Sequence, residues 1–139
     1  MPESPIILPR SLVNRLLHEA QTLEDHEVCG LIGAVEGSPQ NAYPITNVAS
    51  QPRSHFLMDP RDQIRAMKTM RQRGETLFAI YHSHPCAPAL PSREDLEQVS
   101  YPEALTLIIS LKTKGVLEIR AFRLDGHQPE EVPLEMEEL

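Results

Sequence analysis

The spacing of apolar residues along this 139-residue chain is the feature that most restricts its fold. In residues 9–23, Leu12, Leu16, Ala20 and Leu23 recur at helical spacing, which predicts an amphipathic helix that begins near Pro9. Most of the other apolar segments are short runs bounded by glycine, proline or polar residues, as is typical of buried strands. A chain of this pattern must bury its helices against a sheet.

Two more helices are predicted from their start and stop signals. Asp59 is expected to cap a second helix whose first position is Pro60 and which stops before Gly74. Ser92 is the expected N-cap of a third, short helix over residues 92–100.

Five strands are expected, at residues 28–37, 41–48, 76–84, 105–111 and 116–124, with turns around residues 37–39 and 112–115. Residues 125–139 carry weaker signals and allow one more edge strand near residues 131–136, followed by a tail. The order αββαβαββ joins neighbouring strands by short turns and so predicts antiparallel pairing. We therefore expect a mixed α/β fold, a largely antiparallel sheet flanked by helices, in a single domain over residues 1–139.

Charge and composition exclude several classes of function. The net charge of −7 is a poor electrostatic match for nucleic acid. The apolar runs are far shorter than the roughly 20 residues that cross a membrane, and the N-terminal segment lacks the pattern of a signal peptide. Two cysteines, Cys29 and Cys86, cannot make a disulfide scaffold, which favours a reducing, cytoplasmic location.

The spacing of two histidines and one aspartate predicts a metal site. His82 and His84 lie two residues apart at the end of a predicted strand, so both imidazoles point to the same face. The loop after His84 can fold Asp95, in the first turn of the helix capped by Ser92, back towards them. Two nitrogens and one carboxylate oxygen make the three-ligand set of a catalytic zinc site, which leaves a fourth position for water. Zinc makes that water acidic, and a nearby carboxylate can take its proton.

Glu27 is the candidate for this general base, because it stands at the start of the predicted strand that contains Cys29. Spacing alone does not separate it from the other acidic residues, and a solvated loop carboxylate is the simpler alternative. Ser92 has a similar alternative as a plain N-cap, and two histidines alone are more typical of a hydrogen-bonded pair than of a metal site. Cys86 is interpreted as an exposed loop thiol, with reach to the zinc as the alternative hypothesis.

The segment YHSHPCAPALPSREDL, residues 81–96, resembles the H-x-H-x(7)-S-x-x-D signature of the JAMM (MPN+) metalloproteases. It matches at His82, His84, Ser92 and Asp95, and the upstream EVCGLIG, which begins at Glu27, resembles the E-x-C-G-L-x-G strand of the same family. The sequence of this segment is especially similar to that of the small stand-alone prokaryotic members. The resemblance implies a fold similar to that of cytidine deaminase. It also implies one zinc ion on His82, His84 and Asp95, Glu27 as general acid and base, and Ser92 as a support for the oxyanion.

The resemblance also implies a reaction. Members of the family hydrolyse amide or isopeptide bonds next to the C-terminal Gly-Gly of ubiquitin-like proteins, and small bacterial members are associated with ubiquitin-like sulfur carriers. The expected partner is therefore such a carrier, recognised by strand addition to a sheet edge near the metal. Two alternatives are a non-catalytic MPN-type interaction module, which has no need of the metal motif, and a zinc hydrolase of a small peptide. The sequence predicts neither the physiological carrier nor the oligomeric state.

Overall fold

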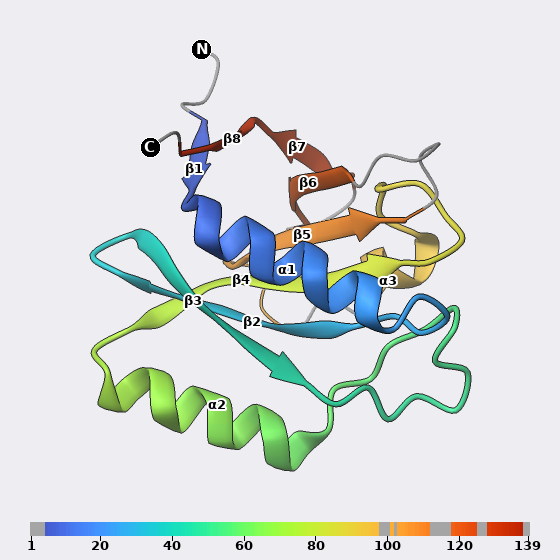
Figure 1. Ribbon diagram of the computed structural model, residues 1–139, viewed down its shortest axis with the longest axis horizontal. Coiled ribbons are helices and arrows are strands. Elements are labelled where there is room, and N and C mark those ends of the chain that lie inside the picture. The colour runs from blue at the N-terminus through green and yellow to red at the C-terminus, as the bar shows by residue number, and fades with distance from the viewer. Residues whose placement is uncertain (1–4, 98–100, 102, 112–117, 125–127, 138–139) are drawn as a thin grey trace.

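A computed structural model of the protein describes residues 5–97, 101, 103–111, 118–124 and 128–137. Its centre is a twisted sheet with the strand order β3-β2-β4-β5-β6-β7 (Figure 1). The strands are β2 (Cys29–Val35), β3 (Ser38–Ile45), β4 (Thr76–His84), β5 (Leu105–Ser110), β6 (Glu118–Arg123) and β7 (Glu130–Val132). Beside this sheet, β1 (Ile6–Leu8) and β8 (Leu134–Met136) form a short parallel pair.

The expected mixed α/β fold with a largely antiparallel sheet is confirmed. Neighbouring strands of the large sheet run antiparallel, except for β4 and β5, which run parallel. The connection between β4 and β5 contains the short helix α3 (Arg93–Glu97), and parallel strands need a crossover of this kind. Ser92 and Asp95 of the signature lie on that crossover, and His82 and His84 lie at the end of β4, so the signature residues meet beside the parallel pair.

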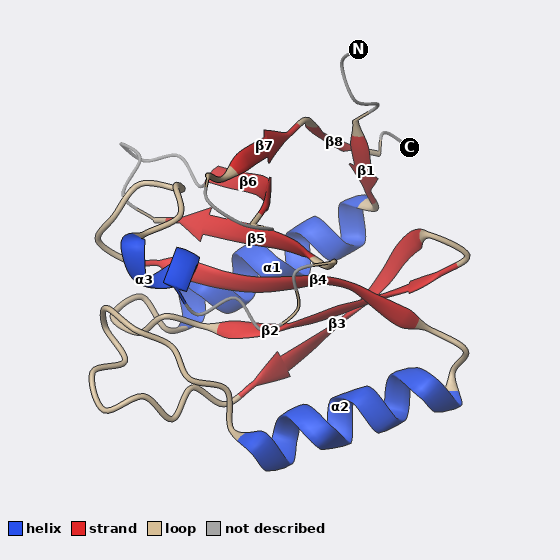
Figure 2. Cartoon of the chain, turned by 180° about the vertical axis from the view of Figure 1, so that it is seen from behind, coloured by secondary structure: helices blue, strands red, loops and turns tan. Residues whose placement is uncertain are grey.

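The helices cover both faces of the sheet. Helix α1 (Arg10–Thr22) buries Leu12 and Leu16 against the face that carries Ala79 and Tyr81 of β4. Helices α2 (Pro60–Gln72) and α3 lie on the opposite face, as the views from the front and from behind show (Figure 2). None of the helices in the described part of the chain is long and apolar enough to cross a membrane.

Several predicted boundaries were wrong, for local reasons. The turn after β2 is at Glu36 and Gly37 rather than at residues 37–39, because both residues adopt positive φ, at 51° and 82°, and make a two-residue hairpin turn. Strand β3 therefore begins at Ser38. The C-terminal segment forms two short strands, β7 and β8, in place of one, and β1 was not predicted. The expected turn at 112–115 and the end of the third helix at 98–100 fall outside the described residues.

Candidate functional site

The site is built on the end of β4. His82 and His84 are alternate residues of this strand, so their side chains leave the same face of the sheet, where they are only 1% and 4% exposed. Their Nε2 atoms lie 3.1 Å apart. The intervening Ser83 points to the other face, where its hydroxyl accepts a hydrogen bond from the backbone N–H of Val28 at 2.9 Å. The strand therefore presents two imidazoles and anchors the chain next to Glu27.

Asp95 completes the group from the first turn of α3. Its Oδ2 atom lies 3.2 Å from the Nε2 atoms of both His82 and His84. The same oxygen accepts a hydrogen bond from the backbone N–H of Ser92 at 2.9 Å, while the Ser92 hydroxyl accepts one from the backbone N–H of Asp95 at 3.0 Å. This reciprocal pair is a capping-box arrangement, and it fixes the orientation of the Asp95 carboxylate.

The geometry of these three atoms fits a tetrahedral metal. Their separations of 3.1, 3.2 and 3.2 Å are close to the ~3.3 Å edges of a tetrahedron whose metal–ligand bonds are ~2.0–2.1 Å long, as they are for zinc. His84 Nδ1 lies 2.8 Å from the carbonyl oxygen of Pro88 and must donate to it, which leaves the lone pair on Nε2. Two imidazole nitrogens and a carboxylate oxygen are also a donor set that zinc accepts.

The other histidine ring has no hydrogen bond at its second nitrogen, so on that side packing alone holds it. Among the described residues, His82 Nδ1 is buried without a hydrogen-bond partner. The ring of Phe56 stacks on the His82 ring with the centroids 4.5 Å apart and the planes 22° apart. Phe56 therefore covers one side of the candidate ligand His82.

Charge at the site suits a cation. Burial lowers the pKa of His82, so this ring is neutral at neutral pH. Burial acts in the same direction on His84, but the Asp95 carboxylate and the Pro88 carbonyl outweigh it and raise the pKa of His84. Burial would raise the pKa of Asp95, yet its hydrogen bonds with the two histidines hold that pKa well below its usual range. A buried anion beside two imidazoles is what a divalent cation requires.

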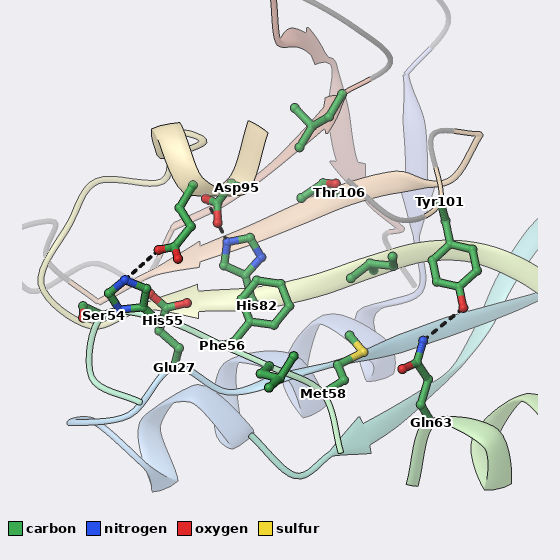
Figure 3. A pocket seen from close by; sticks show the side chains of 14 residues that line it. Glu27, Ser54, His55, Phe56, Met58, Gln63, His82, Asp95, Tyr101 and Thr106 are labelled. Atoms are coloured by element: carbon green, nitrogen blue, oxygen red, sulfur yellow. Dashed lines mark hydrogen bonds and ion pairs between the residues drawn. The ribbon is translucent and has the colours of Figure 1, made fainter. Parts of the chain in front are cut away.

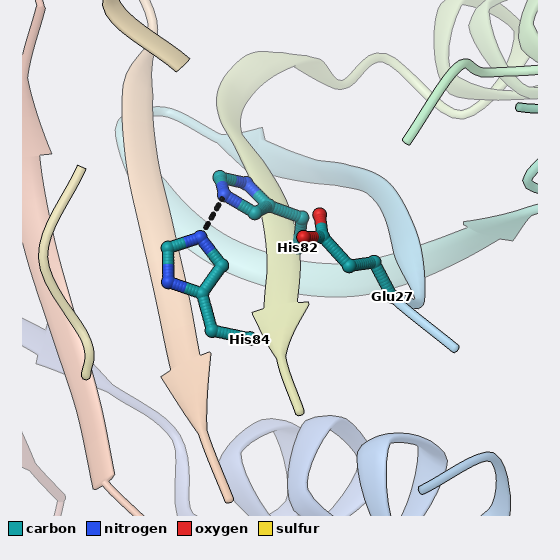
Figure 4. A group of neighbouring side chains, drawn as sticks. All are labelled: Glu27, His82 and His84. Atoms are coloured by element: carbon teal, nitrogen blue, oxygen red, sulfur yellow. Dashed lines mark hydrogen bonds between the residues drawn. The ribbon is translucent and has the colours of Figure 1, made fainter. Parts of the chain in front are cut away.

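Glu27 lies beside the histidines (Figure 4). It immediately precedes the segment that leads into β2 and is 6% exposed, and one of its carboxylate oxygens lies within 4.8 Å of a ring nitrogen of each histidine. Burial raises the pKa of Glu27 to about 8; His84 opposes this shift, and the negative charges of Asp95 and Glu94 add to it. A carboxyl group in this environment can hold and release a proton near neutral pH.

A pocket of about 420 Å³ opens from this cluster across the sheet face. Figure 3 shows that it runs from Glu27 and His82, past Phe56, to Gln63 and Tyr101. At the far end, Gln63 Nε2 donates a hydrogen bond to the Tyr101 hydroxyl at 3.0 Å.

Near the candidate metal ligands, the pocket is bounded by a pair of contacting polar side chains. His55 Nε2 lies 2.7 Å from a carboxylate oxygen of Glu94. None of His55, Phe56, Gln63 and Tyr101 was predicted from the sequence to belong to the site. His55 and Phe56 lie in a loop that carries no periodic pattern, and Gln63 lies on α2 at a position that no motif marks, so no sequence signal pointed to them.

The two cysteines and the histidines His18 and His26 do not line the pocket. The Cys86 thiol is exposed, as predicted for a loop residue. Its Sγ lies 3.7 Å from Arg53 Nη2. That it reaches the zinc remains a hypothesis. Burial raises the pKa of Cys29 to about 12, which makes this thiol a core residue rather than a nucleophile. His18 and His26 are exposed, and His127 falls outside the described residues.

Comparison with known proteins gives consistent matches over most of the chain. The model of a family described as prokaryotic homologs of the JAB domain matches residues 9–125. A "CysO-cysteine peptidase" of Mycobacterium tuberculosis is 30% identical over 129 residues, which cover 91% of this chain and 88% of that protein. A "Probable TtuB-protein conjugate cleaving protease" of Thermus thermophilus is 39% identical over 89 residues, 64% of this chain and 56% of that protein. The solution structure of DSY2949 from Desulfitobacterium hafniense superposes with a TM-score of 0.85 at 32% identity, covering 96% of this chain and 93% of that one.

Proposed function

The chain belongs to the prokaryotic homologs of the JAB domain, and from this premise we propose that it is a zinc-dependent peptidase that cleaves the amide bond after the C-terminal Gly-Gly of a ubiquitin-like or sulfur-carrier protein. The family predicted from the motif is confirmed, and so is the prediction of a hydrolase. Zinc, the bond cut and the roles of the individual residues are the proposed part. With an enzyme supported, the non-catalytic interaction module is set aside.

One observation carries the proposal: a triangle of ligand atoms and a buried carboxyl group meet at the end of one pocket. The ligands are His82, His84 and Asp95, and the carboxyl group is Glu27. A purely structural metal site would be closed by a fourth protein ligand. Here the fourth side adjoins a pocket large enough for part of an extended peptide.

Each of these residues has its own role in the proposed reaction. Zinc bound to His82, His84 and Asp95 would supply Lewis acidity, making water a source of hydroxide near neutral pH and polarising the scissile carbonyl. Glu27 takes the proton of the attacking water on a carboxylate oxygen and later gives it to the departing amine. The Ser92 hydroxyl accepts a hydrogen bond from Asp95, which leaves its own O–H available to donate to the oxyanion.

The surroundings of the ligands favour a glycine tail. Phe56 stacks on His82, and the contacting His55 and Glu94 side chains bound the same end of the pocket, so side chains already occupy the space beside the ligands. A substrate residue without a Cβ atom fits this approach best. The sequence predicts that the tail adds as a strand to a sheet edge near the metal. Strand β4, which carries the histidines, lies between β2 and β5 and is not such an edge, so we propose instead that the tail lies across the sheet face.

The test of the base is Glu27→Gln, which keeps the shape of the side chain but cannot take a proton. We expect the variant to retain one zinc per chain by metal analysis while kcat falls by about 10²–10⁴-fold. Glu24→Gln is the matched control, because Glu24 is exposed in the turn before the site. Full activity of Glu27→Gln, or native protein without stoichiometric zinc, would contradict the proposal.

The substrate class is tested separately. Three probes are compared: a ubiquitin-like protein whose C-terminal Gly-Gly is amide-linked to a fluorogenic amine, its Ala-Ala variant, and a short peptide with the same Gly-Gly amide. We expect zinc-dependent cleavage of the first probe and little of the second. Faster turnover of the short peptide than of the protein would favour the small-peptide hydrolase instead.

A further inference from the structure

The segment of residues 46–58, between β3 and α2, is organised by one side chain. Asn47 Nδ2 donates hydrogen bonds to the backbone carbonyls of Glu27 and His55, each at 2.9 Å. Asn47 Oδ1 accepts hydrogen bonds from the backbone N–H groups of Ala49 and Leu57, each at 3.0 Å. The amide thus uses both of its N–H donors and both lone pairs of its oxygen.

Glu27 depends on this segment because it lies outside the strand. Strand β2 begins at Cys29, so the sheet ladder does not hold the Glu27 backbone. Instead, its N–H donates to the carbonyl of Pro52 at 2.7 Å, and its carbonyl accepts from Asn47. Both backbone groups of the candidate base are therefore held by residues 46–58.

The same segment forms a wall of the pocket. Phe56, which stacks on His82, follows directly after His55, whose carbonyl Asn47 also holds. Leu57, held at its N–H by Asn47, lines the pocket as well. One amide group thus links the base on one side to the pocket wall on the other.

We propose that Asn47 is a positioning residue that holds Glu27 in line with the metal ligands and couples the base to the pocket wall. The inference rests on the proposed function, in which Glu27 is the base. A merely structural role would be limited to shaping the segment through the three bonds that Asn47 makes within it, to His55, Ala49 and Leu57. The bond that it donates to the Glu27 carbonyl is the one that positioning requires, and its bond to His55 joins that carbonyl to the pocket wall.

Two substitutions separate the bonds that Asn47 donates from those that it accepts. Asn47→Asp keeps both acceptor positions for Ala49 and Leu57 but cannot donate to either carbonyl, whereas Asn47→Ala removes all four bonds. Asn41→Ala is the matched control. Asn41 is on β3 and donates to Glu75 at 2.7 Å, opposite Gly33 rather than next to the site.

A double-mutant cycle with Glu27→Gln tests the coupling. In the wild-type background we expect Asn47→Asp and Asn47→Ala to lower kcat by about 10–100-fold, as is typical of partners that orient a metal site, with zinc stoichiometry unchanged. In the Glu27→Gln background, Asn47→Asp should lower kcat by less than about threefold, because the group it positions is already gone. Asn41→Ala should leave kcat unchanged in both backgrounds.

Amide hydrogen exchange in the metal-free protein gives a readout that does not depend on activity. We expect the Glu27 N–H to exchange faster in both Asn47 variants, and the Ala49 and Leu57 N–H groups to exchange faster only in Asn47→Ala. If the kcat losses from Asn47→Asp and Glu27→Gln multiply, or if Glu27 exchange is unchanged, the inference is overturned. If Glu27→Gln alone retains activity, the proposed function fails instead, so the two failures are distinguishable.

Discussion

Ser92 and Asp95 show why the motif has its spacing. Two residues separate them, which is the distance at which a cap and the third residue of a helix exchange hydrogen bonds. The exchange turns the Asp95 carboxylate so that its Oδ2 faces both histidines. The Ser and Asp of the motif thus orient the carboxylate that is the proposed metal ligand.

Replacement of this serine should therefore affect metal binding. Ser92→Ala removes the cap, at a cost of about 1 kcal/mol in the free energy of unfolding, and is expected to weaken zinc binding by about tenfold. Ser92→Thr keeps the hydroxyl and should keep both properties. Competition with a chelator measures the affinity. Kinetics at saturating zinc then isolate the oxyanion role, and an unchanged kcat for Ser92→Ala would argue against it.

Glu19 makes stability depend on pH. Its Oε1 accepts a hydrogen bond from the Tyr81 hydroxyl at 2.6 Å, and burial raises the pKa of Glu19, although Tyr81 and Arg15 oppose the shift. A raised pKa in the folded state favours the protonated form. Below the pKa that Glu19 has in the unfolded chain, this difference has no effect on the free energy of unfolding. As pH rises from there through the pKa of Glu19 in the folded protein, the free energy of unfolding falls.

Glu19→Gln should remove this dependence. The variant is expected to gain stability relative to wild type as pH rises above about 4.5, the ordinary pKa of a glutamate, because from there on only the wild type must bury a charge or keep a proton. Urea unfolding at several pH values measures the difference, with the exposed Glu24→Gln as control. Parallel stability curves for Glu19→Gln and wild type would show that burial of Glu19 carries no such cost.

At the scale of elements, the contact between β2 and β4 requires a glycine. A Cβ atom on Gly30 would overlap the Tyr81 hydroxyl and lie 2.5 Å from the backbone carbonyl oxygen of Tyr43. Tyr81 is fully buried, so it cannot move aside into solvent. The glycine in the EVCGLIG segment therefore lets two strands and a large aromatic side chain pack closely, directly below the site.

Gly30→Ala should separate these strands. We expect a loss of about 1–3 kcal/mol in the free energy of unfolding, typical of overpacking a core. Gly37→Ala is the comparison, because a Cβ atom there meets no atom within 4 Å and only the positive φ of 82° is strained. Chemical denaturation measures both, and a Gly30→Ala protein as stable as wild type would contradict the packing argument.

At the scale of the whole molecule, we infer that the described elements form one domain whose metal site joins two of them. The proposed ligands come from β4 and α3, so zinc bound to them would tie the helix to the sheet. Zinc at about 100 times its dissociation constant should add about 2.7 kcal/mol to the free energy of unfolding. For a domain of this size this corresponds to roughly 10 °C in Tm.

Thermal unfolding with zinc and with a chelator measures this shift. A single transition is expected in both conditions, in agreement with one domain. His82→Ala should unfold at the same temperature with or without zinc. A wild-type Tm that does not respond to zinc would mean that the three side chains hold no metal.

The features that the sequence alone determined depend on residues a few positions apart. The alternation along β4 placed His82 and His84 on one face, and the bounds of this strand were predicted correctly. Asp59 caps α2 through a hydrogen bond from Arg61, as expected from its position before Pro60. Such signals are local in the chain, so they can be read without the fold.

The tertiary structure decided what surrounds the ligands. Asn47 reaches Glu27 across 20 positions, and Gln63 reaches Tyr101 across 38. Phe56 covers His82 from a loop that has no periodic pattern. These contacts depend on the order of strands in the sheet and on the path of residues 46–58. Neither the strand order nor the path of this segment produces a periodic pattern in the sequence, because side chains that meet through the fold need only be compatible in space.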